Sequence, residues 1–173
     1  MPISKDRESI IVPQEELDRQ MEFCGLVHTV LETRLGGRKP LAYVHTFGCQ
    51  GNVADSERLK GLLEKMGFGF TDEAESADIS LFNTCAVREH AEDRLFGNVG
   101  ALKKIKEKNP DFKIILCGCM MQQERIAEKI RRSYPFVDIV FGTHAAHKFP
   151  ELLYRSLSTG KRVFDIENSD GVI

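Results

Sequence analysis

Residues 79–119 read ISLFNTCAVREHAEDRLFGNVGALKKIKEKNPDFKIILCGC, which is an apolar run, a longer segment and a second apolar run. The runs at 79–84 and 113–118 are short and nearly continuous, as in strands that are buried on both faces. The intervening 88–108 has the length and spacing of a helix. Two buried strands joined by a helix predict neighbouring strands of a parallel sheet.

The same alternation continues on both sides of this unit. It predicts an α/β fold in which a five-stranded parallel sheet carries helices on both faces, of the flavodoxin-like or Rossmann-like kind. A further strand is predicted in the tail, at 161–166, outside these five. The remaining strands of the sheet are expected at 41–47, 67–71 and 137–141, and the remaining helices at 53–66, 121–133 and 145–157.

The N-terminal part of the chain differs from this pattern. From residue 13 to 35, apolar residues recur every three or four positions, and two glycines and a proline follow. This spacing predicts an amphipathic helix that ends at the glycines. We therefore expect three segments, which are an N-terminal extension (1–38), the α/β domain (39–157) and the start of a linker (158–173).

Composition excludes several classes of protein. The 173 residues are 42% hydrophobic and 29% charged, which is typical of a globular chain with a real core. No apolar run is long enough for a bilayer and no secretory leader is visible, so we expect a cytoplasmic protein without a membrane partner. The formal net charge of −2 provides no general attraction to nucleic acid.

Five cysteines are present, and three of them each follow a predicted strand, namely Cys49, Cys85 and Cys119. Their odd number and wide spacing argue against a disulfide framework. The carboxyl ends of parallel strands share one edge of the sheet, so these three thiols are expected to converge. Three thiolates favour an iron–sulfur or zinc site with one open position. The alternative is that each cysteine is only a small buried side chain.

The other candidates for metal binding have simpler interpretations. Cys117 would share a strand face with Cys119 and could replace it as a ligand, but a buried thiol is favoured. Cys24 lies on the apolar stripe of the N-terminal helix and is expected in the core. Asn52 is expected to be the N-cap of the helix at 53–66. Four histidines are interpreted as polar surface residues: His45, His90, His144 and His147.

Three motifs around the cysteines resemble those of the methylthiotransferase family. Residues 46–57 read TFGCQGNVADSE, similar to the family pattern T-x-G-C-x-x-N-x-x-D-S-E. Residues 83–91 read NTCAVREHA, similar to N-T-C-x-V-R-x-x-A, and 117–122 read CGCMMQ, similar to G-C-M-x-Q. The resemblance covers about residues 41–157 and identifies the chain as similar to the N-terminal domain of the MiaB-type, radical S-adenosylmethionine branch of the family.

The resemblance implies that Cys49, Cys85 and Cys119 ligate an auxiliary [4Fe–4S] cluster whose open iron carries the sulfur delivered to the substrate. In that family a second [4Fe–4S] cluster, bound by a C-x-x-x-C-x-x-C motif in a following domain, cleaves S-adenosylmethionine. That motif does not occur in this chain. We therefore expect a fragment that has no catalytic residue of its own and cannot methylthiolate a substrate alone.

The resemblance also implies a substrate and partners. These are C2 of N6-isopentenyl (dimethylallyl) adenosine in the anticodon loop of tRNA, bound through the full-length enzyme, and a sulfur donor. The fragment itself is expected to be monomeric. Gln50, Asn52 and the segment 86–88 favour this branch over relatives that modify threonylcarbamoyl-adenosine or a ribosomal protein. Arg88 and Glu89 are interpreted either as neighbours of the cluster or as surface charges.

Two functions of other classes remain open. A structural zinc module would use the same thiols, but it needs a fourth ligand from Cys117 or a histidine. A nucleotide-binding flavodoxin-like domain would need a glycine-rich phosphate loop after the first strand. The segment 48–52 has a thiol at that place instead.

Overall fold

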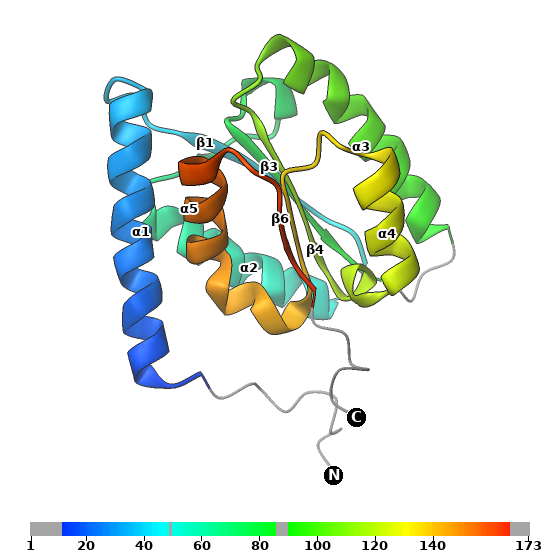
Figure 1. Ribbon diagram of the computed structural model, residues 1–173, viewed down its shortest axis with the longest axis horizontal. Coiled ribbons are helices and arrows are strands. Elements are labelled where there is room, and N and C mark those ends of the chain that lie inside the picture. The colour runs from blue at the N-terminus through cyan, green and yellow to red at the C-terminus, as the bar shows by residue number, and fades with distance from the viewer. Residues whose placement is uncertain (1–11, 49, 86–89, 167–173) are drawn as a thin grey trace.

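The computed structural model describes residues 12–48, 50–85 and 90–166. In this part of the chain, parallel strands form one sheet in the order β2-β1-β3-β4-β5-β6 (Figure 1). An α-helix separates consecutive strands except between β2 and β3, which are not neighbours in the sheet and are joined by a short 3₁₀ turn (Ala74–Ser76). The strands are β1 (Leu41–Thr46), β2 (Gly69–Phe70), β3 (Ile79–Thr84), β4 (Lys113–Gly118), β5 (Ile139–Phe141) and β6 (Val163–Asp165).

The α/β class and the parallel sheet are confirmed, but the prediction of five strands is wrong because the tail strand belongs to the sheet. Val163 pairs with Ile139, so β6 extends the edge of the sheet beside β5 in parallel. The guanidinium of Arg162 donates hydrogen bonds to the carbonyl oxygens of Val137 and Tyr134 at 2.8 and 3.0 Å. These bonds attach the start of β6 to the segment between α4 and β5, which brings the tail into register.

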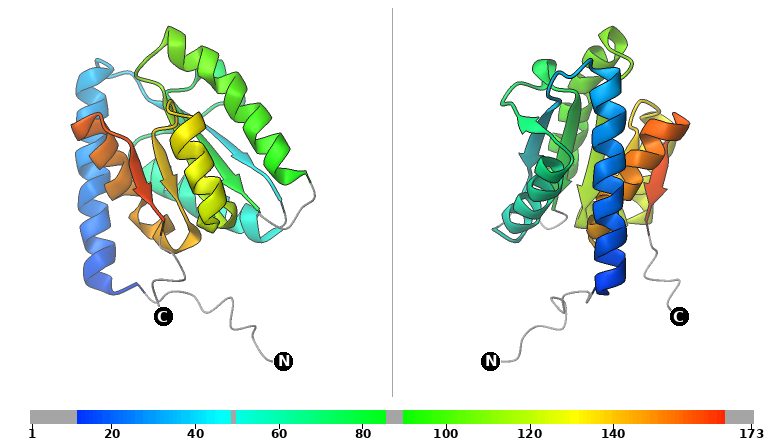
Figure 2. Two further views of the ribbon diagram at one scale, coloured as in Figure 1. Left: turned by 45° about the vertical axis from the view of Figure 1, so that its right-hand side comes forward. Right: turned by 90° about the vertical axis from the view of Figure 1, so that its left-hand side faces the viewer.

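Helices cover both faces of the sheet, as predicted, and they group by face (Figures 1 and 2). Helices α2 and α5 pack on one face together with α1, whereas α3 and α4 pack on the other. Each group encloses its own apolar cluster, so the sheet is buried on both sides. The helices are α1 (Gln14–Arg34), α2 (Gln50–Lys65), α3 (Ala91–Lys108), α4 (Glu124–Ser133) and α5 (Phe149–Thr159).

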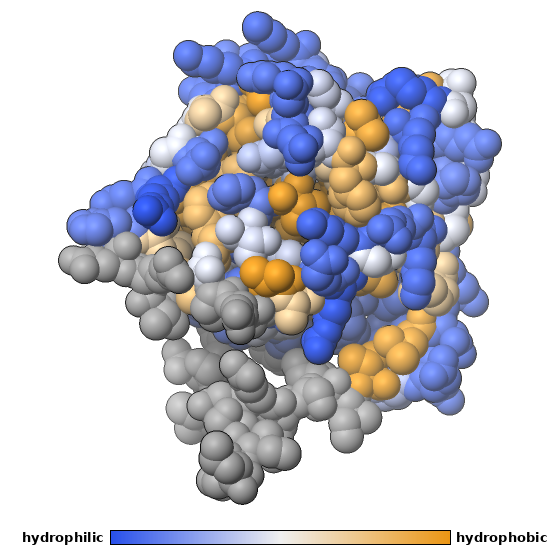
Figure 3. Space-filling model, turned by 180° about the vertical axis from the view of Figure 1, so that it is seen from behind, coloured by the Kyte–Doolittle hydropathy of each residue, from blue (hydrophilic) through white to orange (hydrophobic). Residues whose placement is uncertain are grey.

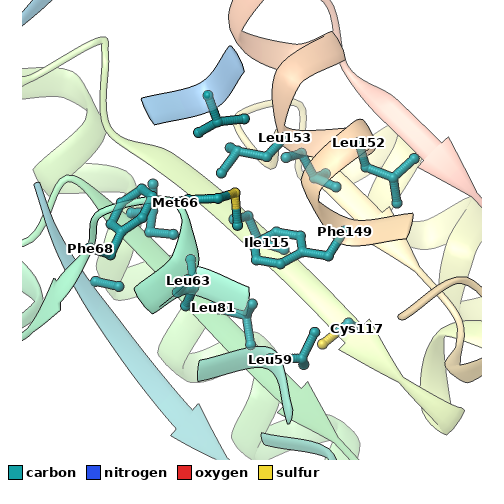
Figure 4. Close-up of a cluster of buried hydrophobic side chains, with 14 of the residues drawn as sticks. Leu59, Leu63, Met66, Phe68, Leu81, Ile115, Cys117, Phe149, Leu152 and Leu153 are labelled. Atoms are coloured by element: carbon teal, nitrogen blue, oxygen red, sulfur yellow. The ribbon is translucent and has the colours of Figure 1, made fainter. Parts of the chain in front are cut away.

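The cluster between the sheet and helices α2 and α5 is the larger one (Figure 4). Leu63 of α2, Ile115 of β4 and Phe149 of α5 are fully buried in it. These side chains come from both the first and second halves of the α/β unit. The strands that carry the cysteines are therefore held by apolar packing on this face of the sheet.

The predicted N-terminal helix is present as α1, and it belongs to this core. Figure 2 shows α1 lying alongside α5, and α1 also contacts α2. Its residues Cys24, Val27 and Leu31 are buried, which confirms the core interpretation of Cys24. The buried side chain of Gln20 donates a hydrogen bond to Glu151 of α5 at 3.0 Å and accepts one from the Glu151 backbone at 3.1 Å.

The outer surface is mixed. On the side opposite to Figure 1, hydrophobic residues lie between hydrophilic ones (Figure 3). Within the described ranges, no helix has the length and apolar character needed to cross a membrane. Exposed large apolar residues include Leu17, Met21 and Leu26 on α1.

Two leucines of α1 test whether this helix stabilises the domain. Leu31 packs in the core and is 8% exposed, whereas Leu26 is 44% exposed. We expect Leu31→Ala to lower the free energy of unfolding by about 2 kcal/mol or more, because a cavity adds to the lost burial. Leu26→Ala should change it by about 0.5 kcal/mol or less. Urea unfolding of both variants measures the difference, and equal effects would show that α1 is not docked as described.

Candidate functional site

The carboxyl ends of β1, β3 and β4 lie side by side, and each leads directly to a cysteine segment. Thr46 of β1 pairs with Asn83 of β3, and Thr84 of β3 pairs with Gly118 of β4. Cys85 follows β3 directly, and Cys119 follows β4 directly. Cys49 lies outside the described residues. The structure thus describes two of the three predicted ligands directly, and the chain on both sides of the third.

The Cys119 thiol contacts the peptide group that precedes Cys85. The Sγ atom of Cys119 is 3.7 Å from the carbonyl oxygen of Thr84, to which its thiol donates a hydrogen bond. Thr84 is the residue immediately before Cys85. Cys85 is buried and Cys119 is half-buried, so both thiols belong to the same edge of the sheet, one deeper than the other.

Gly48 places the chain before Cys49 against Cys85. A Cβ atom at Gly48 would overlap the Cβ of Cys85 and would lie 3.3 Å from its Sγ. The φ angle of Gly48 is +121°, a conformation that side-chain-bearing residues rarely adopt. Among the described residues no group of three potential metal ligands forms. Convergence of all three cysteines therefore stays a prediction, with the Gly48 contact as its support.

Gly118 allows the end of β4 to lie close against the end of β3. Its φ angle is +107°, and a Cβ atom there would overlap the Thr84 carbonyl oxygen and lie 2.8 Å from Asn83 Oδ1. Cys119 then begins a short 3₁₀ helix (Cys119–Gln122) instead of continuing the strand. The regular alternation ends at this point, so the expectation that Cys117 and Cys119 share a strand face is wrong.

A buried polar network lies beneath these ends and joins β1, β3 and α2. The Asn83 side chain donates hydrogen bonds to the Asn52 carbonyl oxygen at 2.8 Å and to Ser56 Oγ at 3.0 Å. The hydroxyl oxygens of Ser56 and Thr46 are 2.6 Å apart. Because buried polar groups are costly without partners, these bonds favour one relative position of the three segments.

Two further bonds connect this network to the cysteine-bearing loops. The Asn52 side chain donates to the Thr84 carbonyl oxygen at 2.8 Å, the same oxygen that Cys119 contacts. The Thr84 hydroxyl donates to the Cys117 carbonyl oxygen at 2.7 Å. Asn52 lies inside α2, which begins at Gln50, so its expected role as the N-cap is wrong. Its amide instead joins α2 to the end of β3.

Cys117 is a core thiol, as the sequence analysis favoured. It is 1% exposed and points into the apolar cluster near Leu59 (Figure 4). Burial raises the pKa of the Cys117 thiol far above its ordinary value, so this group stays protonated. Burial also raises the pKa of the Cys24 thiol. Neither environment favours the thiolate that a metal ligand requires.

The interpretation of the histidines is wrong in part. His45 is half-buried among aromatic rings, and burial lowers the pKa of its imidazole below its ordinary value. His144 is also half-buried, with Nε2 3.4 Å from Asp165 Oδ1. His147 is half-buried as well, whereas His90 is exposed, as expected. Arg88 and Glu89 lie outside the described residues.

A cavity of about 380 Å³ opens beside Cys85. The sequence analysis did not identify it, although the alternating Tyr43, His45 and Phe47 place three rings on one face of β1 and its continuation. One wall comes from the end of β1 and the other from the first turns of α3. The lining residues are His45, Thr46, Phe47, Gly48, Cys85, Ala91, Arg94 and Asn98.

The donor set suits a soft metal centre. Cysteine thiolates are the ligands of iron–sulfur clusters and of zinc. The Cys119 thiol contacts the carbonyl oxygen of the residue before Cys85, and the two glycines with positive φ leave room for the backbone to turn closely around a bulky group. Cys85 and Cys119 therefore fit a cluster bound by three cysteines, provided that Cys49 supplies the third thiolate.

Comparison with known proteins agrees with the resemblance in the motifs. A family described as "Uncharacterized protein family UPF0004" matches residues 41–142. The chain is 42% identical over 169 residues to a protein of Clostridioides difficile named tRNA-2-methylthio-N(6)-dimethylallyladenosine synthase, covering 96% of this chain and 35% of that protein.

Proteins with the same name in other bacteria are also similar. The chain is 49% identical over 137 residues to that of Caldicellulosiruptor saccharolyticus, covering 79% of this chain and 29% of the relative. It is 52% identical over 132 residues to that of Clostridium perfringens, covering 76% and 30%. The chain thus spans about a third of the length of these curated relatives.

Gly118 provides a test of the site's backbone geometry. We expect Gly118→Ala to destabilise the domain by about 2 kcal/mol or more, because positive φ and the overlap with Thr84 both oppose a methyl group. Gly100, inside α3 with no atom within 4 Å of an added Cβ, is the matched control. Gly100→Ala should stabilise by up to about 1 kcal/mol. Thermal unfolding compares the two, and an unchanged Gly118→Ala variant would contradict the described turn.

Proposed function

This chain belongs to the family described as uncharacterized protein family UPF0004, and on that premise we propose that it is the cluster-binding part of a tRNA methylthiotransferase. In this proposal Cys49, Cys85 and Cys119 hold one [4Fe–4S] cluster. The observation that carries it is the contact of the Cys119 thiol with the Thr84 carbonyl oxygen, next to Cys85 in the chain, with Gly48 packed against Cys85.

The names of the relatives support the reaction and its substrate. They describe synthases of 2-methylthio-N6-dimethylallyladenosine in tRNA. We propose the same activity for the whole protein to which this chain contributes, with tRNA and a sulfur donor as its partners in the cytoplasm. The names favour this substrate over threonylcarbamoyl-adenosine or a ribosomal protein.

Within this proposal the chain binds the cluster and positions its cysteine ligands. A [4Fe–4S] cluster held by three cysteines supplies, when bound, one iron that is open to an external sulfur ligand. Cys85 and Cys119 contribute thiolates, and the Asn52 amide keeps the Thr84 carbonyl oxygen hydrogen-bonded after the Cys119 thiol loses its proton. Gly48 and Gly118 allow the backbone to turn closely at the site.

The chemistry of S-adenosylmethionine is assigned elsewhere in this proposal. No C-x-x-x-C-x-x-C motif occurs in the 173 residues, so a second cluster and S-adenosylmethionine belong to another domain. We propose that this chain alone is monomeric and does not methylthiolate tRNA. Structural zinc needs Cys117 or a histidine as its fourth ligand, and it is less well supported with Cys117 because this thiol faces the apolar core.

Anaerobic iron and sulfide reconstitution tests the ligand set. We expect the unmodified chain to take up about four iron and four sulfide ions, with the Mössbauer spectrum of a [4Fe–4S] cluster. Cys49→Ala, Cys85→Ala and Cys119→Ala should each lose this signal, since each removes one of three ligands. Cys117→Ala, in the same segment as Cys119 but in the core, is the matched control and should keep it.

Two outcomes would contradict this proposal. A cluster that persists without Cys49, Cys85 or Cys119 would refute the ligand assignment. Stoichiometric zinc uptake that needs Cys117, together with no iron–sulfur signal, would support the structural zinc module instead. Circular dichroism of each variant separates loss of the ligand from loss of the fold.

A further inference from the structure

We propose that the cavity beside Cys85 is the subsite for an adenine nucleotide of the RNA substrate, with the base against His45 and Phe47 and the phosphate at Arg94. The inference rests on the proposed function, since it names the part of the substrate that this chain contacts. It goes further by assigning substrate recognition to three residues that are not cysteines.

The β1 wall of the cavity is an ordered set of rings. The centroids of His45 and Phe47 are 4.4 Å apart with an interplanar angle of 73°. Phe82 of β3 packs edge-on against both of them, and Tyr43 stacks parallel to His45. Rings held by such contacts offer a preorganised surface, and aromatic side chains are the platforms on which unpaired bases stack.

His45 is suited to this contact for a second reason. It is half-buried, and burial lowers the pKa of its imidazole, so the ring is neutral at neutral pH. A neutral ring presents an apolar face to a base. Both His45 and Phe47 line the cavity, together with Thr46 between them.

The α3 wall supplies a cation and an amide. Arg94 and Asn98 are exposed one helical turn apart and line the cavity. Within the described part of the chain, Arg94 has no carboxylate at ion-pair distance, and Glu92 of the same helix pairs instead with Arg125 at 2.9 Å and Lys129 at 3.5 Å. A guanidinium without such a partner is available to bind phosphate oxygens through two N–H groups.

Size and position select the occupant. The volume of about 380 Å³ lies in the range of small-molecule sites. Cys85 also lines the cavity, so a base bound there lies beside one of the proposed cluster ligands. The relatives are named for modification of an adenosine in tRNA. A small sulfur anion would engage Arg94, but it would make no use of the stacked rings.

Binding of adenosine 5′-monophosphate to the cluster-free chain tests the inference, followed by NMR chemical shifts. We expect the largest shifts at His45, Phe47 and Arg94, and about fivefold weaker binding of ribose 5-phosphate, which lacks the base. Arg94→Glu should weaken the nucleotide about tenfold or more. Arg155→Glu, an exposed α5 position, makes the same charge change elsewhere and should leave binding within about twofold.

His45→Leu tests the base contact, because it keeps an apolar side chain but removes the ring. It should weaken adenosine 5′-monophosphate several-fold and leave ribose 5-phosphate unchanged. Equal binding of the two probes would show only an anion site and would overturn the inference. Chemical-shift changes that lie away from the cavity, or equal effects of Arg94→Glu and Arg155→Glu, would also overturn it. Iron uptake is measured separately and should be normal in all three variants, so failure of the cluster assignment and failure of the subsite remain distinguishable.

Discussion

The parallel register of β1, β3 and β4 is the constraint on which the site depends. Thr46 lies opposite Asn83, and Thr84 lies opposite Gly118, so three segments distant in sequence leave the sheet at one level. A slip by one residue would turn each side chain to the opposite face. The apolar clusters on both faces oppose such a slip, because Leu81 and Ile115 would have to pack in the other cluster, whose space is already filled by other side chains.

The polar network adds a directional constraint that apolar packing cannot provide. Apolar contacts are nearly indifferent to small rotations, whereas the Asn83 amide must meet both the Asn52 carbonyl oxygen and Ser56 Oγ. Asn52 in turn donates to the Thr84 carbonyl, which the Cys119 thiol also contacts. Stability of the domain and order of the cysteine loops are thus linked through the same few buried groups.

The strands and helices were largely predictable from the sequence, because buried parallel strands and amphipathic helices leave local patterns. Cys85 and Cys119 were also predictable as neighbours, since topology alone brings the ends of β3 and β4 together. The sixth strand was not assigned to the sheet, because its pairing depends on Arg162 contacts that only the fold creates. His45 was missed because its burial comes from Phe82, a ring of a neighbouring strand.

Two further errors have the same origin. The role of Asn52 depends on the distance between α2 and β3, which no local pattern records. The separation of Cys117 from Cys119 depends on the positive φ of Gly118. The most direct test of the account is an anaerobic crystal structure of the reconstituted chain with anomalous data at the iron edge. It should show one group of iron atoms bonded to Sγ of Cys49, Cys85 and Cys119. Iron bonded to Cys117, or to none of Cys49, Cys85 and Cys119, would contradict the account.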